Sequence, residues 1–400
     1  MESLKKKVAI IGVGTTQFAK AIPGRTNMSM QLEAAVKAIK DAGLTKDDID
    51  GIITGEGGLN PRTHIMFSEC LGIFHKPVCL NLPVGGGTCG LSVVVARWAI
   101  ASGRCKNVLI VAGGATMGQL GRSTVGHGFT DSLALFAGHS PTYEQPFGPL
   151  IISYYASIAQ RHMYEYGTTS EQLAAIGVAQ RKHASLNPEA IMRLPITIED
   201  VVSSRMVTSP LHLLDCCINS DGGAALVVTS AERAKDAPKK PVYVLGLGHA
   251  SSSYFTGDLA VKRPELGYSL TKTIGRIAAD DAFEEAGVER RDMRFAQLYD
   301  NFSITPLIQL EDFGFCKKGE GGAFVEGGRI EPGGELPVNT HGGHLSCNFT
   351  PAGYVHWVEG VRQVRGECGA RQVPNADLGL VCTVASTIGT FGGVGILGRE

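Results

Sequence analysis

Apolar and polar residues follow one another in the same order twice along this chain. Residues 8–14 form an apolar run that ends in a glycine turn, and residues 242–248 repeat this pattern. Apolar residues at helical spacing follow each run, and both helical segments end in Ala-Gly, at residues 42–43 and 286–287. Since internal repetition decides the architecture, the pattern predicts two related halves, each built on a strand, a helix and a further strand.

Later segments extend the repeat. Short apolar strands are expected at residues 49–54 and 295–299, after the two Ala-Gly endings. A glycine-rich turn then leads into a helix and a strand at residues 85–112, and the same order recurs at residues 342–383. Residues 108–112 are apolar without interruption, which is typical of a parallel strand buried on both faces. The predicted class is therefore α/β.

The middle of the chain breaks this pattern. Residues 121–149 are rich in Gly, Ser, Thr, Phe and His and are expected to form a long loop. Two helices are expected at residues 152–164 and 171–183, and Thr168 and Glu171 are expected to form a capping box at the start of the second. Because long irregular segments in compact proteins are usually functional or disordered, we interpret this region as covering an active site.

The predicted organisation has three parts. An N-terminal half spans residues 1–118 and a C-terminal half spans residues 240–400. Between them, residues 119–235 form an inserted loop domain that covers the active site and returns to the first half.

Composition and charge exclude several classes of protein. The 400 residues are 44% hydrophobic and 19% charged, which is ordinary for a globular protein, and the formal net charge is −1. Without a basic stripe, the chain is not expected to bind nucleic acid or an anionic membrane. No apolar run approaches the length of a membrane span, and the short apolar run after the basic N-terminus does not form a signal peptide.

The cysteines and the first glycine turn exclude further functions. Ten cysteines occur without the spacing of a zinc site or a disulfide framework. We therefore expect reduced thiols in a cytoplasmic protein and no bound metal. The sequence Gly-Val-Gly-Thr-Thr-Gln at residues 12–17 is similar to a dinucleotide fingerprint but lacks the third glycine, so a nicotinamide cofactor is not expected.

Two segments carry candidate chemistry. Residues 85–89, Gly-Gly-Gly-Thr-Cys, open a helix. They form either a tight structural turn or a site in which the helix N-terminus stabilises the thiolate of Cys89. Residues 299–302, Tyr-Asp-Asn-Phe, are polar at the end of an apolar strand. Such a cluster usually faces the ligand crevice of an α/β sheet, and the alternative is a loop that caps the sheet with Asp300.

The duplicated halves and these motifs resemble the thiolase superfamily, and most of all its sterol-carrier-protein and lipid-transfer-protein branch. The resemblance covers essentially the whole chain. The segments that carry it, besides the glycine turn with Cys89, are residues 210–217, 220–225, 298–302, 310–316, 319–321, 339–343 and 359–366. It implies a thiolase fold, which is a duplicated, five-layered α-β-α-β-α structure, and a homodimer. It also implies an acyl-CoA substrate, with coenzyme A as a substrate and no tightly bound cofactor.

The expected catalytic positions depart from the family pattern. The position of the nucleophilic cysteine falls on Gly86. Cys89 lies one helical turn later, so it either points into the same cavity or is a buried structural thiol. The position of the family's Gly-His-Pro histidine falls on Phe349, whose ring cannot transfer protons. Cys347 lies two residues earlier, and His344 in the same turn is a candidate replacement for the base.

Two thiols on paired turns favour a thiolytic reaction as the main prediction. A thiolate, Cys89 or Cys347, would attack the β-ketone of a 3-oxoacyl-CoA, leaving an acyl-enzyme and an enolate, and coenzyme A would then take the acyl group. The enolate needs hydrogen-bond donors, and the candidates are Asn301 and the backbone amides of Gly342 and Gly343. The resemblance extends to thiolases of this branch that cleave aromatic substrates such as benzoylsuccinyl-CoA.

Two alternatives remain open. Sterol-carrier thiolases place a histidine where Tyr299 stands, whereas related steroid side-chain aldolases place a tyrosine there and another at the position of Phe349. The first alternative is therefore retro-aldol cleavage of a β-hydroxyacyl-CoA with Tyr299 as the base, and His356 is a further candidate base beside the turn. The second alternative is a non-catalytic subunit. Members of this branch often work with a small zinc-ribbon and OB-fold acyl-CoA-binding protein, so such a partner is expected, and it would hold the zinc.

Overall fold

The computed structural model describes residues 7–55, 62–74, 77–115, 117–118, 151–251, 269–384 and 391–399. The long loop expected at residues 121–149 lies outside this part of the chain. Among the helices of the described ranges, none combines the length and the apolar character that crossing a membrane requires.

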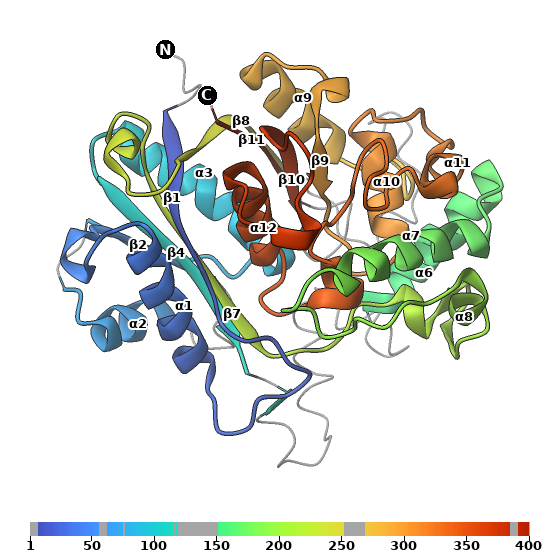
Figure 1. Cartoon of the computed structure of the whole chain (residues 1–400), viewed down its shortest axis with the longest axis horizontal. Helices are drawn as coiled ribbons and strands as arrows, with labels where there is room; N and C mark the ends of the chain where they lie inside the picture. Colours follow the sequence, from blue (N-terminus) through green and yellow to red (C-terminus); the bar gives the residue numbers. More distant parts are fainter. Residues whose placement is uncertain are drawn as a thin grey trace, which may run out of the picture.

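Nine strands of the described residues form one mixed sheet whose two arms mirror each other (Figure 1). The first arm contains β1 (Val8–Thr15), β2 (Gly51–Gly55), β3 (Val78–Asn81), β4 (Asn107–Gly114) and β7 (Gly222–Ser230). The second arm contains β8 (Val242–Ser251), β9 (Phe295–Gln297), β10 (Leu378–Val384) and β11 (Phe391–Gly398). The strand order is β3-β2-β4-β7-β1-β8-β11-β10-β9, so β7, β4 and β2 lie where β11, β10 and β9 lie on the other side.

The two arms meet at a short antiparallel contact between β1 and β8. Ala9 lies opposite Tyr243, and Ile10 lies opposite Val242. On its other side, Tyr243 lies opposite Gly398 at the end of β11. The first strand of each half is therefore at the centre of the sheet, and the last described strand of each half lies next to it.

Helices form three layers around the two arms (Figure 1). The helices of the described residues are α1 (Asn27–Asp41), α2 (Thr63–Leu71), α3 (Thr88–Ala101), α6 (Ile151–Tyr166), α7 (Ser170–Ser185), α8 (Ile198–Val202), α9 (Gly275–Ala286), α10 (Ile304–Asp312), α11 (Gly321–Val325) and α12 (Tyr354–Arg365). Helices α3 and α12 contact strands of both arms and form the middle layer. Helices α1 and α2 cover the outside of the first arm, and α9 covers the outside of the second with α10 beside it. This is the predicted α-β-α-β-α arrangement.

Strand residues alternate between two apolar cores. Val8 and Ile10 of β1 pack into the core that α3 and α12 share, whereas Ala9 and Ile11 pack into the core beneath α1. Both faces of the strand are therefore buried, which explains why these runs carry no polar alternation.

Where the sequence predicted a glycine turn at the end of each apolar run, strands β1 and β8 instead continue through residues 12–14 and 246–248. The glycines there let a helix pack directly on each strand. A Cβ at Gly12 would lie 2.2 Å from a backbone oxygen of α1, and a Cβ at Gly246 would lie 1.9 Å from a backbone oxygen of α9. A left-handed glycine follows each of these helices, with φ of 71° at Gly43 and 68° at Gly287. The sequence repeat therefore corresponds to a repeated strand–helix contact.

Both helices expected in the middle of the chain form, as α6 and α7, and β7 returns from this region to the first arm. The capping box of α7 was predicted one residue too early. Thr169, rather than Thr168, accepts the N–H of Gln172, and the Gln172 side chain, rather than Glu171, completes the box. Thr169 has the extended backbone of a capping residue, with φ −109° and ψ 164°.

The second glycine turn differs from the prediction. The repeat predicted that the turn at residues 342–343 leads directly into a helix. Instead, Gly343–Cys347 form a wide π-type turn, because this segment wraps around a buried carboxylate at the end of β9, and α12 begins only at Tyr354. Gly353, with φ of 79°, is the residue that meets the first turn: a Cβ there would lie 2.5 Å from the Gly86 carbonyl oxygen.

Candidate active site

The end of β9 is where elements of both halves converge. Tyr299 follows β9 by two residues and is 5% exposed. A Cβ at Gly86 would lie 2.2 Å from the Tyr299 hydroxyl, so the phenol lies directly beside the start of α3. On another side, the Tyr299 ring meets the His344 ring edge-on, with centroids 5.1 Å apart. The two glycine turns singled out in the sequence therefore lie on either side of one tyrosine.

The carboxylate of Asp300 is fully buried and holds the second turn. It accepts the backbone N–H groups of His344 at 2.8 Å and Leu345 at 3.3 Å, and it lies 3.1 Å from Nε2 of His356. A Cβ at Gly343 would lie 2.1 Å from its Oδ2, so a side chain there would displace the carboxylate. Burial raises the pKa of Asp300 to about 6, and the neighbouring donors oppose that shift. Asp300 therefore caps the turn, and at neutral pH it does so as an anion.

His344, a candidate base, has both ring nitrogens engaged. Nδ1 lies 2.8 Å from the carbonyl oxygen of Asn348, to which it donates, and the N–H of Gly353 donates to Nε2 at 3.2 Å. Burial lowers the pKa of His344 to about 4, so the ring is neutral at physiological pH. The ring therefore ties the two ends of the turn together.

His356 is more central than the sequence indicated. Its ring stacks on Tyr299 with centroids 6.3 Å apart and meets His344 at 4.4 Å. Burial lowers the pKa of His356 to about 3, so its Nε2 carries the proton that it shares with Asp300. The signal that could have found this network is two histidines beside a glycine turn, together with an aspartate at the end of a strand.

One group of the described residues has the types and spacing of metal ligands. The ligand atoms of Asp300, His344 and His356 lie within 4.8 Å of one another. The contacts just described, however, already use both nitrogens of His344 and the Nε2 of His356, and a metal ion would have to displace them. The residues fit a hydrogen-bonded network better than a metal centre.

The two predicted nucleophiles lie in the apolar core between the arms. Cys89 and Cys347 are almost fully buried there, and burial raises the pKa of each thiol well above its ordinary value. Cys347 has an amide contact with Nδ2 of Asn187, at 3.6 Å. Tyr299 packs in a different apolar cluster, although its hydroxyl reaches the start of α3. The structure thus provides neither thiol with surroundings that favour a thiolate.

Of the residues expected to stabilise an enolate, Asn301 and Gly342 make hydrogen bonds within the protein, Asn301 through its acceptor oxygens and Gly342 through its N–H. Oδ1 of Asn301 accepts the hydroxyl of Thr305 at 2.7 Å, and the Asn301 carbonyl oxygen accepts the N–H of Cys217 at 2.9 Å. The N–H of Gly342 donates to the carbonyl oxygen of Asn339 at 2.7 Å. These contacts hold the loops around Tyr299 in place.

Phe349 stands at the other end of the turn. Its ring meets His344 edge-on at 5.3 Å, and its N–H donates to Oγ of Ser220 at 2.9 Å. A phenyl ring cannot exchange a proton at this position. At the end of β9, the phenol of Tyr299 can therefore exchange a proton, whereas the phenyl ring of Phe349 cannot.

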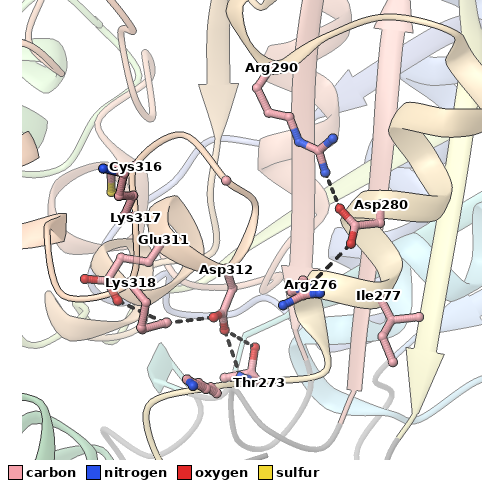
Figure 2. A pocket seen from close by; sticks show the side chains of 12 residues that line it. Thr273, Arg276, Ile277, Asp280, Arg290, Glu311, Asp312, Cys316, Lys317 and Lys318 are labelled. Atoms are coloured by element: carbon pink, nitrogen blue, oxygen red, sulfur yellow. Dashed lines mark hydrogen bonds and ion pairs between the residues drawn. The ribbon is translucent and has the colours of Figure 1, made fainter. Parts of the chain in front are cut away.

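The acidic and glycine-rich segment at the end of α10 builds a surface pocket instead (Figure 2). This pocket of about 1010 Å³ is lined by residues from the α9 and α10 regions. Figure 2 shows Lys318 between Glu311 and Asp312, at 2.9 and 2.7 Å. Glu311 also accepts the N–H groups of Gly319 and Gly321. This part of the family-like pattern therefore has a structural explanation, since the carboxylates fold the loop that follows α10.

Comparisons with known proteins agree with this architecture. Residues 265–399 match the family model described as "Thiolase C-terminal domain-like". A "Steroid side-chain-cleaving aldolase" of Thermomonospora curvata is 36% identical over 92% of each chain, and the "Benzoylsuccinyl-CoA thiolase subunit BbsB" of Thauera aromatica is 31% identical over 92% of each. A solved structure described as "Ltp2-ChsH2(DUF35) aldolase" has a TM-score of 0.86 at 34% identity, covering 99% of this chain and 98% of that one. The chain therefore belongs to the thiolase superfamily, as a member of its sterol-carrier-protein-2-like branch.

Proposed function

We propose that this protein cleaves the Cα–Cβ bond of a β-hydroxyacyl-CoA by a retro-aldol reaction, with Tyr299 as the base. One observation carries the proposal. The phenol of Tyr299 occupies the space beside Gly86, at the position where the family's nucleophilic cysteine would stand. The reacting group offered there is thus an acid–base group and not a nucleophilic thiol.

The Tyr299 phenol alone can carry both proton transfers of this reaction. The phenolate of Tyr299 takes the proton of the β-hydroxyl, and the O–H electron pair forms a C=O bond at Cβ. The Cα–Cβ bond then breaks, and its electrons move into the thioester as an enolate. The phenol returns a proton to Cα, which yields a ketone or aldehyde and a shorter acyl-CoA. Proton transfer by a positioned side chain contributes roughly 10²–10⁴ in rate.

The thiolytic reaction is less well supported. It needs a thiolate, yet Cys89 and Cys347 are buried in an apolar core where burial favours the neutral thiol. The relatives point the same way, because the aldolase of Thermomonospora curvata is 36% identical to this chain, compared with 31% for the benzoylsuccinyl-CoA thiolase subunit. The aldolase's name supports cleavage of a C–C bond, and the thiolase subunit's name supports a coenzyme A thioester as the substrate, with coenzyme A as part of the substrate and not as a bound cofactor.

A partner subunit and a dimer are part of the proposal. The name of the similar solved structure joins Ltp2 with ChsH2(DUF35), which supports an assembly with a small acyl-CoA-binding protein. Strand β3 lies at the edge of the sheet, and Leu80 on it and Phe74 before it are 39% and 62% exposed. An exposed apolar edge strand invites pairing, so a second copy of the chain is proposed to bind there. Leu80→Lys is expected to shift the protein to a monomer by light scattering.

The test of the activity uses the requirement for coenzyme A. Retro-aldol cleavage releases a carbonyl product without added coenzyme A, whereas thiolysis consumes it. Tyr299→Phe is expected to lower kcat by roughly 10²–10⁴. Tyr164→Phe, at a tyrosine of α6 that is 80% exposed, is the control and is expected to keep full activity.

Variants of the thiols complete this test. Cys89→Ala and Cys347→Ala are each expected to keep kcat within a few-fold. An acyl-cysteine trapped in the absence of coenzyme A would contradict the proposal and support thiolysis. A protein that binds acyl-CoA but cleaves none, even with its partner, would instead be a non-catalytic subunit.

A further inference from the structure

We infer that Gly86 is the residue that positions the reactive phenol: by lacking a side chain, it seats the Tyr299 hydroxyl against the start of α3. This inference rests on the proposed retro-aldol function for its chemical meaning. The contact on which it is built is independent of any activity.

The three heavy atoms nearest to the space beside Gly86 all belong to Tyr299. A Cβ at Gly86 would lie 2.2 Å from the Tyr299 hydroxyl oxygen, 2.4 Å from Cζ and 2.5 Å from Cε2. Real Cβ contacts do not come that close, so even alanine would force the ring to move. Tyr299 is 95% buried by its neighbours, with rings of His344 and His356 beside it, and it has little room to yield.

The backbone of the turn is also fixed. Gly85–Gly87 form a tight helical turn that continues without a break into α3 at Thr88. The hydroxyl of Thr88 accepts the N–H of Val84 at 3.2 Å and donates to the Gly85 carbonyl oxygen at 2.7 Å. From the other side, a Cβ at Gly353 would lie 2.5 Å from the Gly86 carbonyl oxygen. Gly86 is therefore held between the second turn and the tyrosine, and it cannot retreat from an added side chain.

The position has a chemical consequence. The first N–H groups of a helix have no partner inside the helix, and the helix dipole adds a positive field at that end. The phenol oxygen of Tyr299 lies beside this turn and therefore close to the positive end of the α3 dipole. Gly86 thereby supplies the space that brings the tyrosine to this position.

A double-mutant cycle on stability tests the contact without any substrate. Gly86→Ala is expected to lower the midpoint of urea unfolding in the natural background, but to change it little when combined with Tyr299→Ala, which removes the ring. Gly90→Ala is the matched control on α3, because its Cβ would meet the hydroxyl of Thr383 and not Tyr299. This control is expected to lower the midpoint equally with and without the ring. Equal losses for Gly86→Ala in both backgrounds would overturn the inference.

A second cycle tests the positioning role through kinetics. If Gly86 acts through Tyr299, Gly86→Ala and Tyr299→Phe each lower kcat by roughly 10²–10⁴, and the double variant is no slower than Tyr299→Phe alone. Losses that multiply would show an effect on the fold at large and would overturn the role. Should the unmodified protein cleave no β-hydroxyacyl-CoA, the proposed function fails, while the stability cycle still decides whether Gly86 seats the ring.

Discussion

His344 is expected to make the protein sensitive to acid, and replacing it with glutamine tests this. The ordinary pKa of this histidine is 6.5, and burial lowers it to about 4 in the folded protein. As the pH falls from 7 to 5, the unfolded chain takes up about 0.7 of a proton at this residue while the folded protein takes up about 0.1. The free energy of unfolding therefore falls by about 2 kcal/mol over this range because of His344 alone.

The His344→Gln variant removes this titration. Urea unfolding at pH 7, 6 and 5 is expected to show a pH-dependent loss about 2 kcal/mol smaller than in the unmodified protein. Asp300, whose folded pKa is raised, acts in the opposite direction between its ordinary value and about 6. His344 is one of the groups that lower the Asp300 pKa, so the variant raises that pKa further, which also makes the loss of stability on acidification smaller. Glutamine offers a donor and an acceptor, but on a flexible chain and at other positions than the ring nitrogens that contact Asn348 and Gly353, so a constant offset of about 1–3 kcal/mol is expected at every pH.

The pH dependence of the free energy of unfolding, and not the constant offset between the two proteins, tests the prediction. Equal slopes for His344→Gln and the unmodified protein would refute the reasoning, because they would mean that the folded protein protonates His344 as readily as the unfolded chain does.

Two further predictions concern buried contacts away from the tyrosine. Arg371 lies 3.0 Å from the buried carboxylate of Glu359, so Arg371→Met is expected to leave an unpaired buried charge and to cost about 3–5 kcal/mol in urea unfolding, and a loss below about 1 kcal/mol would contradict this. A Cβ at Gly248 would lie 1.7 Å from the Ala278 carbonyl oxygen, so Gly248→Ala is expected to cost about 3 kcal/mol. Gly327→Ala, which meets no atom within 4 Å but has φ of 69°, should cost only about 1 kcal/mol, and similar thermal midpoints for the two alanine variants would argue against close helix–strand packing.

Much of the fold could be predicted because short, local sequence patterns indicate the repeated strand–helix units. The glycines within β1 and β8 and the Ala-Gly endings of α1 and α9 each have a direct packing reason, so the sequence pattern reflects these contacts. Buried strands likewise reveal themselves through uninterrupted apolar runs. The joining of the two arms through β1 and β8 could not be read this way, because strand order depends on pairing between residues more than 200 positions apart.

The candidate site was only partly predictable, for a related reason. Tyr299 and the two glycine turns were found, since strand ends and glycine turns are local signals. The counterpart of the first turn was placed at residues 342–343, whereas the structure has it at Gly353. The buried Asp300 accepts backbone N–H groups of the second turn, and the helix begins only at Tyr354. Asp300 is far from this turn in the sequence, so the spacing of residues within the turn does not reveal the contact. The two cysteines attracted attention for their chemistry, yet only the fold shows that they are buried in an apolar core.

The contact between the two arms at Tyr243 also determines how the chain could be circularly permuted. Ala9 and Gly398 flank this one residue from opposite sides, which puts the start of β1 and the end of β11 two strand spacings, roughly 10 Å, apart. A linker of a few residues would therefore close the chain into a ring, and cutting it open in the segment 231–241 would give a circular permutant in which the second half is synthesised first. Because β1, β7, β4 and β2 of the first arm correspond in order to β8, β11, β10 and β9 of the second, such a permutant should assemble the same sheet with its halves in exchanged order.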